Sequence, residues 1–405
     1  LFCWAMTKTW GQNYRGSSWN LGLEKEMEMK ADTYNFESAH SELYRKPKSI
    51  AEAAVLFSAR TVWFHDDEDG TPDNIIMSNP ASTDCWRGWC EMLMLENVIF
   101  DVIGDDDLAE GKNFERYRLI ILPNSVCLSD KEIESLKTFV RNGGKLIVTH
   151  QTGLKNETGA PRGKYVLAEL VGAEYEKVRR ASSAWVKNNE QYPVAIKKYN
   201  PGNFPLADFK LAGNTVPIMA EEGGGKQAVI FHNDYGKGSV ITFAGKPGRV
   251  ICVNRHKCFE KGGKRFAEIE FFPDRELLSI MKNMVFYLLG ENRQLIPKNL
   301  PMGFISGLFR HGNRTVLHVV NAAGALADNG KDIPIPAPLQ FPTAERLQGN
   351  AKTIELKVKA DGENAILRSP DFSGEKQLQC RRDNEYILLF IPAGLIKCYS
   401  VIEIK

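Results

Sequence analysis

Long apolar runs, an excess of one charge and paired cysteines are all missing from this sequence of 405 residues. No apolar stretch approaches the roughly 18 residues that a membrane-spanning helix needs, so we expect no membrane association. Lysine and arginine together number 52 against 50 aspartates and glutamates, which leaves a net charge of +2. This balance gives no electrostatic reason to expect nucleic acid as a partner.

The eight cysteines are scattered, and none forms a Cys-x-x-Cys pair. Cys252, His256 and Cys258 are the one cluster that resembles part of a zinc site, but a structural zinc needs four ligands and no second half follows. The spacing does not specify a disulfide framework either. We therefore expect buried or loose thiols, no metal and no cofactor.

The length and an apolar content of 43% indicate two or three globular domains. Residues 1–48 are predicted to form a strand (1–6), a loop and an amphipathic helix (21–44), and the chain begins with Leu1, as a mature product or a piece of something longer would. Residues 49–296 are predicted to be an α/β domain and residues 297–405 a small β-sandwich.

The α/β prediction comes from short apolar runs that alternate with helical patterns. Strands are predicted at residues 53–58, 98–103, 117–122 and 145–150, and helices at residues 85–96, 130–141 and 165–171. Residues 60–83 and 104–107 are predicted to be polar loops. Ser129 and Glu132 have the spacing of a capping box at the start of the second helix. Such tight alternation of apolar strands with helices indicates a parallel sheet covered on both faces.

The pattern then changes to short strands separated by glycine and proline turns, which indicates an antiparallel addition to the sheet. These strands are predicted at residues 194–196, 215–219, 228–232 and 239–244, before a closing helix at 273–289. After Pro301 the pattern is purely β. Six strands are predicted there, at residues 304–309, 315–320, 354–358, 365–368, 386–391 and 399–404.

Four segments carry a resemblance to a known family: SIAEAAVLFSA (49–59), YRLIILP (117–123), NGGKLIVT (142–149) and RTVLHVVN (314–321). In this order they resemble the C-terminal half of β-galactosidases that carry a trimerisation domain, and of related glycosidases of bacterial polysaccharide degradation. The resemblance implies a flavodoxin-like, class I amidotransferase-like α/β domain followed by a β-sandwich. It also implies a catalytic (β/α)8 barrel upstream, whose two catalytic glutamates this sequence does not contain.

The turn at residues 150–153 lacks the nucleophile of true amidotransferases. It is His150-Gln151-Thr152-Gly153, without a cysteine and without a His-x-Glu on a later strand. A thiolate with a histidine base and oxyanion donors is what amide hydrolysis requires there. Thr152 is a weak substitute, because a threonine hydroxyl needs a strong base. His150 is more simply interpreted as a strand-end residue that hydrogen-bonds a loop.

Other candidates lie in loops that follow the strands, where ligands bind in open parallel sheets. As catalytic candidates we consider His150, Asp66 and Asp105, and as substrate-binding candidates Trp63, His65 and Gln151. The acidic loop 65–69 suits a hard cation but lacks the spacing of an EF-hand, so a solvated turn is the simpler interpretation. The pairs Glu221/Glu222 and Glu268/Glu270 are not convincing as glycosidase carboxylates.

We therefore expect a non-catalytic C-terminal portion of a glycoside-hydrolase-like protein. It would form a homo-oligomer, support a neighbour's active site and have a carbohydrate as a possible ligand. The alternatives are a stand-alone hydrolase that uses Asp66, Asp105 and His150, which would meet in a deep pocket, or a carbohydrate-binding scaffold. A periplasmic or secreted location is favoured over a cytoplasmic one.

Overall fold

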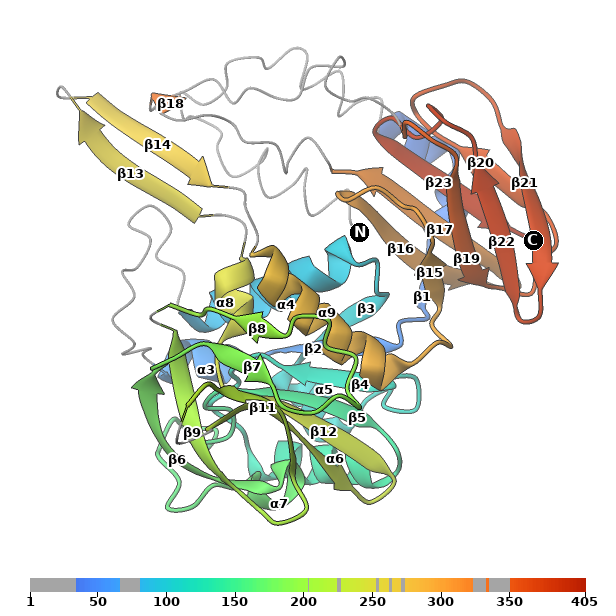
Figure 1. Cartoon of the computed structure of the whole chain (residues 1–405). Coiled ribbons are helices and arrows are strands. Elements are labelled where there is room, and N and C mark those ends of the chain that lie inside the picture. Colours follow the sequence, from blue (N-terminus) through green and yellow to red (C-terminus); the bar gives the residue numbers. More distant parts are fainter. Residues whose placement is uncertain are drawn as a thin grey trace. The chain divides into compact units, whose positions relative to one another are not determined.

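The computed structural model of the chain describes residues 34–65, 81–202, 204–223, 227–252, 255–261, 264–270, 274–322, 333–334 and 350–405. It divides into two compact units. Unit 1 comprises Leu1–Ile50, Asn254–Phe271 and Gln294–Lys405, and unit 2 comprises Ala51–Val253 and Phe272–Arg293. Each unit has its own sheet (Figure 1).

Unit 2 contains a mixed sheet of nine strands whose order is β3-β2-β4-β5-β12-β11-β10-β7-β8. The first five of these strands pair in parallel with their neighbours. They are β3 (Phe100–Gly104), β2 (Ala53–Phe57), β4 (Leu119–Leu122), β5 (Lys145–Thr149) and β12 (Gly238–Phe243). All four residues of β4 are buried, as expected of a strand covered on both faces. The four predicted parallel strands are thus confirmed.

The other four strands extend the sheet in antiparallel pairing. They are β11 (Ala228–Tyr235), β10 (Val216–Glu221), β7 (Trp185–Lys187) and β8 (Lys198–Tyr199). Two predictions here were wrong. Residues 194–196 form no strand, and residues 239–244 belong mainly to β12, which pairs in parallel with β5 on one side and antiparallel with β11 on the other. An apolar run shows that a strand is buried but not the direction of its neighbours.

A separate two-stranded sheet, which the sequence did not predict, consists of β6 (Ala173–Arg180) and β9 (Pro205–Leu211). Most side chains of β6 are exposed. The strand therefore lacks the apolar run on which the other strands were recognised.

Helices cover both faces of the mixed sheet (Figure 1). On one face α4 (Ala81–Leu95) packs against α8 (Pro247–Ile251) and α9 (Arg275–Leu289). On the other lie α5 (Asp105–Glu110), α6 (Asp130–Arg141) and α7 (Ala168–Val171). The predicted capping box of α6 is present, because the Ser129 Oγ accepts from the Glu132 N–H at 3.3 Å and the Ser129 N–H donates to Glu132 Oε2 at 2.6 Å.

Two segments predicted to be loops contain helices. Residues 60–83 were predicted to be a polar loop, but most of α3 (Ala59–Phe64) lies there, with the Ser58 Oγ accepting from the Thr61 N–H at 3.1 Å as an N-cap. Residues 104–107 were also predicted to be a loop, but Asp105 is the first residue of α5. Three aspartates in a first turn suit the positive end of a helix.

Unit 1 contains an antiparallel sheet with the order β1-β16-β17-β23-β20-β21-β22-β19-β15. Its strands are β1 (Lys48–Ser49), β15 (Leu295–Pro297), β16 (Phe304–His311), β17 (Arg314–Asn321), β19 (Ile354–Lys359), β20 (Ala365–Arg368), β21 (Lys376–Asp383), β22 (Tyr386–Ile391) and β23 (Tyr399–Ile404). The predicted hairpin of β16 and β17 is confirmed, with Gly312 at φ +60° in its turn. The polar strand β21 was not predicted. A smaller sheet joins β13 (Arg255–Lys261), β14 (Lys264–Glu270) and β18 (Ile333–Pro334).

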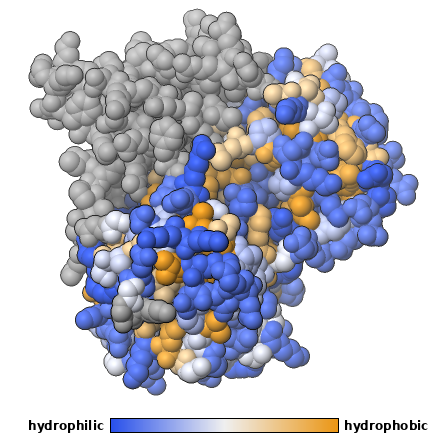
Figure 2. Space-filling model, viewed as in Figure 1, coloured by the Kyte–Doolittle hydropathy of each residue, from blue (hydrophilic) through white to orange (hydrophobic). Residues whose placement is uncertain are grey.

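The N-terminal prediction is tested only in part. Residues 34–39 are helical and lead into the 3-10 helix η1 (Ser41–Leu43), whereas the predicted strand and loop at 1–20 lie outside the described residues. Leu43 is fully buried in a cluster with Val316, Tyr399 and Val401. Within the described part of the chain, every helix is too short or too polar to span a lipid bilayer. Figure 2 shows that hydrophilic residues predominate on the visible surface of the described residues.

Candidate functional site at the carboxyl edge of the mixed sheet

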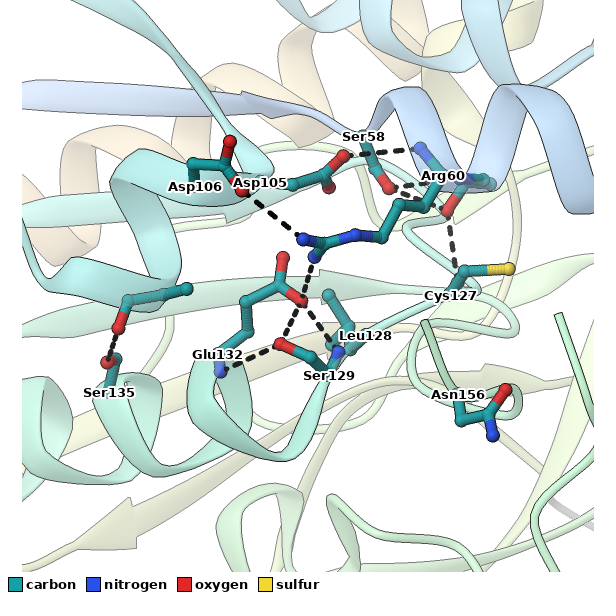
Figure 3. A network of polar contacts seen from close by, with 12 residues as sticks. Ser58, Arg60, Asp105, Asp106, Cys127, Leu128, Ser129, Glu132, Ser135 and Asn156 are labelled. Atoms are coloured by element: carbon teal, nitrogen blue, oxygen red, sulfur yellow. Dashed lines mark hydrogen bonds and ion pairs between the residues drawn. The ribbon is translucent and has the colours of Figure 1, made fainter. Parts of the chain in front are cut away.

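Strands β2, β3, β4 and β5 run in parallel, so their carboxyl ends meet at one edge of the sheet. The residues that follow them form a network of polar contacts (Figure 3). This is the edge at which ligands bind in open α/β sheets.

Arg60 is the centre of this network. Its guanidinium donates to Glu132 Oε2 at 2.7 Å and to Asp106 Oδ1 at 3.3 Å, and its backbone N–H donates to Asp105 Oδ2 at 3.2 Å. Figure 3 shows the Arg60 side chain reaching from α3 across to both α5 and α6. Arg60 thus ties together three elements that follow different strands.

Glu132 is fully buried although it carries a carboxyl group. Burial raises the pKa of Glu132, and the hydrogen bonds from Ser129 and the charge of Arg60 oppose this only in part. Losing Arg60 would leave the Glu132 carboxyl buried beside Asp105 without its cation, an arrangement that is costly inside a protein. The network therefore fixes the structure of this edge.

Asp105 is the one catalytic candidate that the structure brings into this network. It is 8% exposed and accepts from the backbone of Arg60 rather than facing open solvent. Asp66 lies outside the described residues. Among the described residues of this edge, the cavity between Ser58 and Asn124 measures about 10 Å³, room for about one water molecule.

The turn after β5 is held by hydroxyl groups. The Thr152 Oγ donates to the Thr149 carbonyl oxygen at 2.7 Å and accepts from the Ser125 N–H at 3.1 Å. The Thr149 Oγ accepts from the Asn124 N–H at 2.7 Å. Both threonines are buried, so Thr152 stabilises the turn and has neither the exposure nor the base that a nucleophile needs.

His150 and Gln151 lie in the same turn. His150 is 1% exposed and has φ +48°, an uncommon backbone conformation for a residue other than glycine. Its backbone N–H donates to the Phe243 carbonyl oxygen at 2.9 Å. Gln151 is half-buried, and its backbone N–H donates to Asn124 Oδ1 at 3.1 Å. The His150 side chain is thus closed to solvent, whereas Gln151 is partly exposed.

The substrate-binding candidate Trp63 lies on α3, next to Phe64. Trp63 is 74% exposed and Phe64 46% exposed. His65, the next residue, is half-buried and ends the helix, with its backbone N–H donating to the Thr61 carbonyl oxygen at 3.0 Å. Among the described residues, Trp63 is the most exposed of the large apolar side chains. Trp63 is thus the candidate best placed to contact another molecule.

Cys127 is the thiol nearest to this network. Its backbone N–H donates to the Thr61 Oγ at 3.0 Å, and its side chain is fully buried. Burial raises the pKa of the Cys127 thiol, and the charge of Lys155 opposes this. A buried thiol with a raised pKa is a poor nucleophile, so Cys127 does not replace the missing amidotransferase cysteine. Among the described residues no group of three or more potential metal ligands occurs.

Sequence reasoning missed Ser58, Arg60 and Asn124. Asn124 follows Pro123 with φ +51° and is fully buried, and asparagine tolerates this conformation better than most residues. A signal existed only for Glu132, through the capping box. Nothing in the local pattern pairs Arg60 with a residue 72 positions away.

The comparisons with known proteins point to one family. Residues 51–252 match the model of the β-galactosidase trimerisation domain. The β-galactosidase BglY of Alicyclobacillus acidocaldarius is 26% identical over 204 residues, which are 49% of this chain and 27% of that protein. The β-galactosidase GalA of Bacillus licheniformis is 28% identical over 108 residues, 27% of this chain and 15% of that protein. The chain thus spans about a quarter or less of these curated relatives.

Solved structures show the same fold at low identity. The β-galactosidase of Bacillus circulans sp. alkalophilus has a TM-score of 0.57 at 15% identity, over 95% of this chain and 45% of that chain. The α-L-fucosidase isoenzyme 2 of Paenibacillus thiaminolyticus has a TM-score of 0.62 at 13% identity, over 92% of this chain and 51% of that chain. At these identities the likeness concerns the fold alone.

Proposed function

Because residues 51–252 belong to the β-galactosidase trimerisation domain family, we propose that this chain is the assembly portion of a larger glycoside-hydrolase-like protein. The domain itself is a non-catalytic part of such enzymes. The matched residues coincide with the first segment of unit 2, Ala51–Val253. This family match is the observation that carries the proposal. A catalytic barrel elsewhere in the protein, and a galactoside substrate, are parts of the proposal.

The finer fold assignment is also proposed. The five parallel strands have the order β3-β2-β4-β5-β12, which in chain order is the 2-1-3-4-5 arrangement of flavodoxin-like proteins. His150, with its positive φ, directly follows β5, where an amidotransferase would place a strained nucleophile turn. In unit 1, β21 pairs with β20 through its first residues and with β22 through its last. A strand shared in this way supports a sandwich.

The surface that we propose for assembly is the exposed side of α3. Trp63 and Phe64 leave two aromatic side chains in solvent at the carboxyl edge of the sheet. Tryptophan is enriched among the few residues that contribute most of the binding energy in protein interfaces. In a homo-oligomer, Trp63 would contact the neighbouring subunit, where it would also help to wall the neighbour's sugar-binding cleft.

The proposal is tested by the mass of the chain in solution together with an assay on aryl glycosides. We expect a defined homo-oligomer of the 45.5 kDa chain and no turnover of any aryl glycoside. Trp63→Ser should shift the assembly toward monomer, whereas Lys131→Ser, on the exposed side of α6, should not. A monomeric wild-type chain, or turnover that is lost in Asp105→Asn, would overturn the assembly role.

A further inference from the structure

A surface groove of about 750 Å³ lies in unit 2. One wall is α6, which contributes Asp130, Ile133 and Lys137, spaced so that they share one helix face. The opposite side is formed by the ends of β6 and β9, and residues 164–169 lie between them. Figure 1 shows α6, α7, β6 and β9 in the same part of the unit. The volume is within the range of small-molecule sites.

The charges around the groove cancel. Its lining contains three lysines and three carboxylates. Lys137 Nζ lies 3.1 Å from Glu169 Oε2, and Glu174 lies directly opposite Lys210 in the pairing of β6 with β9. A lining without net charge gives neither a phosphate nor a cation an electrostatic advantage. It does offer many hydrogen-bond donors and acceptors to a neutral ligand.

Tyr165 gives an independent reason to expect a ligand. It lines the groove and is 7% exposed, yet among the described residues its hydroxyl has no hydrogen-bond partner. Its ring packs against Tyr175 and Phe209, with centroids 6.1 Å and 5.9 Å away, which holds it in place. A buried hydroxyl without a partner is costly, and such groups usually have a partner in the functional state.

The composition of the lining argues against a protein partner. Lysine, glutamate and aspartate are depleted in protein interfaces, whereas exposed aromatic residues and arginine are enriched. Here the charged lining residues are of the depleted types, and the single aromatic residue, Tyr165, is buried. The groove thus differs from α3, where Trp63 is open to solvent.

We propose that this groove binds a neutral sugar, whose hydroxyls are held by Glu174, Lys210 and, once the exposed side chains beside it have shifted, Tyr165. The choice of a sugar among neutral hydroxyl-rich molecules rests on the proposed role in a glycoside hydrolase. The site would hold a saccharide on the assembly portion.

The test is a titration of the full chain with galactose, lactose, glucose, mannose and arabinose, followed by saturation-transfer NMR. At least one sugar should bind in the millimolar range or tighter. Glu174→Gln should weaken that binding about tenfold, because it removes a charged acceptor. Tyr165→Phe should weaken it by a similar factor without lowering the melting temperature, since it removes a hydroxyl that lacks a partner in the free protein.

The matched control is Glu134→Gln, an exposed carboxylate on α6 that does not line the groove. It should bind as the wild type does. Silence with all five sugars, or equal binding by wild type, Glu174→Gln and Tyr165→Phe, would overturn the site. The mass in solution distinguishes failure of this proposal from failure of the proposed assembly role. An oligomer that binds no sugar contradicts only the sugar site, and a monomer that binds sugar contradicts only the assembly role.

Discussion

Gly88 allows the backbones of α4 and α8 to touch, because neither helix has a side chain at their closest point. A Cβ atom added to Gly88 would lie 1.7 Å from the carbonyl oxygen of Gly248 and 2.4 Å from its carbonyl carbon. The opposite change meets the same obstacle, since a Cβ on Gly248 would lie 2.1 Å from the Cys85 carbonyl oxygen. These neighbours are backbone atoms, so no change of rotamer relieves the clash and the helices must move apart.

The expected cost of Gly88→Ala follows from two opposing effects. Overpacking of a tight contact costs about 3 kcal/mol at the upper end of the usual range, which is where a clash with backbone belongs. Alanine in a helix is more favourable than glycine by about 1 kcal/mol. The net loss in the free energy of unfolding is therefore about 2 kcal/mol, which corresponds to a fall in Tm of roughly 4–8 °C for a unit of this size.

Thermal unfolding followed by circular dichroism measures this loss. The control is Gly163→Ala, because a Cβ at Gly163 meets no atom within 4 Å, and its Tm should stay within about 1 °C of the wild type because surface changes are small. A wild-type Tm in Gly88→Ala would show that the two helices do not touch as described. The position of α8, and with it the packing under the mixed sheet, would then need revision.

Three further outcomes are expected. Burial opposes the ionisation of Glu221, but the hydrogen bonds and charge of Arg179 lower its pKa overall; its contribution is present above the unfolded pKa of about 4.3 and is lost as pH falls through the lower folded pKa. When the pH is lowered below that value, the free energy of unfolding measured with urea should therefore fall more for the wild type than for Glu221→Gln. An equal fall in both proteins would refute this. Thr152→Val should cost about 1–3 kcal/mol in urea unfolding, because it leaves the Ser125 N–H without its acceptor. Cys127 should resist a thiol reagent in the native chain, as mass spectrometry would show, and rapid labelling would contradict its burial.

The strands of the parallel part could be predicted because burial on both faces leaves a strong local signal. β2 and β4 are apolar throughout and lie beside turn residues, so their sequence alone indicates buried strands. β6 gives no such signal, because most of its side chains are exposed and it pairs with β9 in a separate sheet of two strands. Pairing direction was equally hidden for β12, since direction depends on neighbours that are distant in sequence.

The candidate site was harder to predict than the fold because its contacts are non-local. The parallel direction of the strands indicated which loops share an edge, because the loops that follow parallel strands meet at the carboxyl edge of the sheet. Side-chain partners could not be predicted in this way, because Arg60 contacts Glu132 and Asp106 on two other helices. Acidic residues in a presumed loop suggested reactive carboxylates. The structure shows that Asp105 begins a helix, where a carboxylate stabilises the exposed N–H groups.

The polar groups at the carboxyl edge are mostly used within the protein. Thr149 and Thr152 accept backbone N–H groups from the loop after β4, and Asn124 accepts one from the turn after β5. An edge that binds substrate keeps such donors and acceptors open, since binding must replace their contacts with water. Here they bind one another, whereas the aromatic side chain of Trp63 is exposed. Such an edge fits the assembly role proposed above, and the search for sugar binding is directed to the groove beside Tyr165.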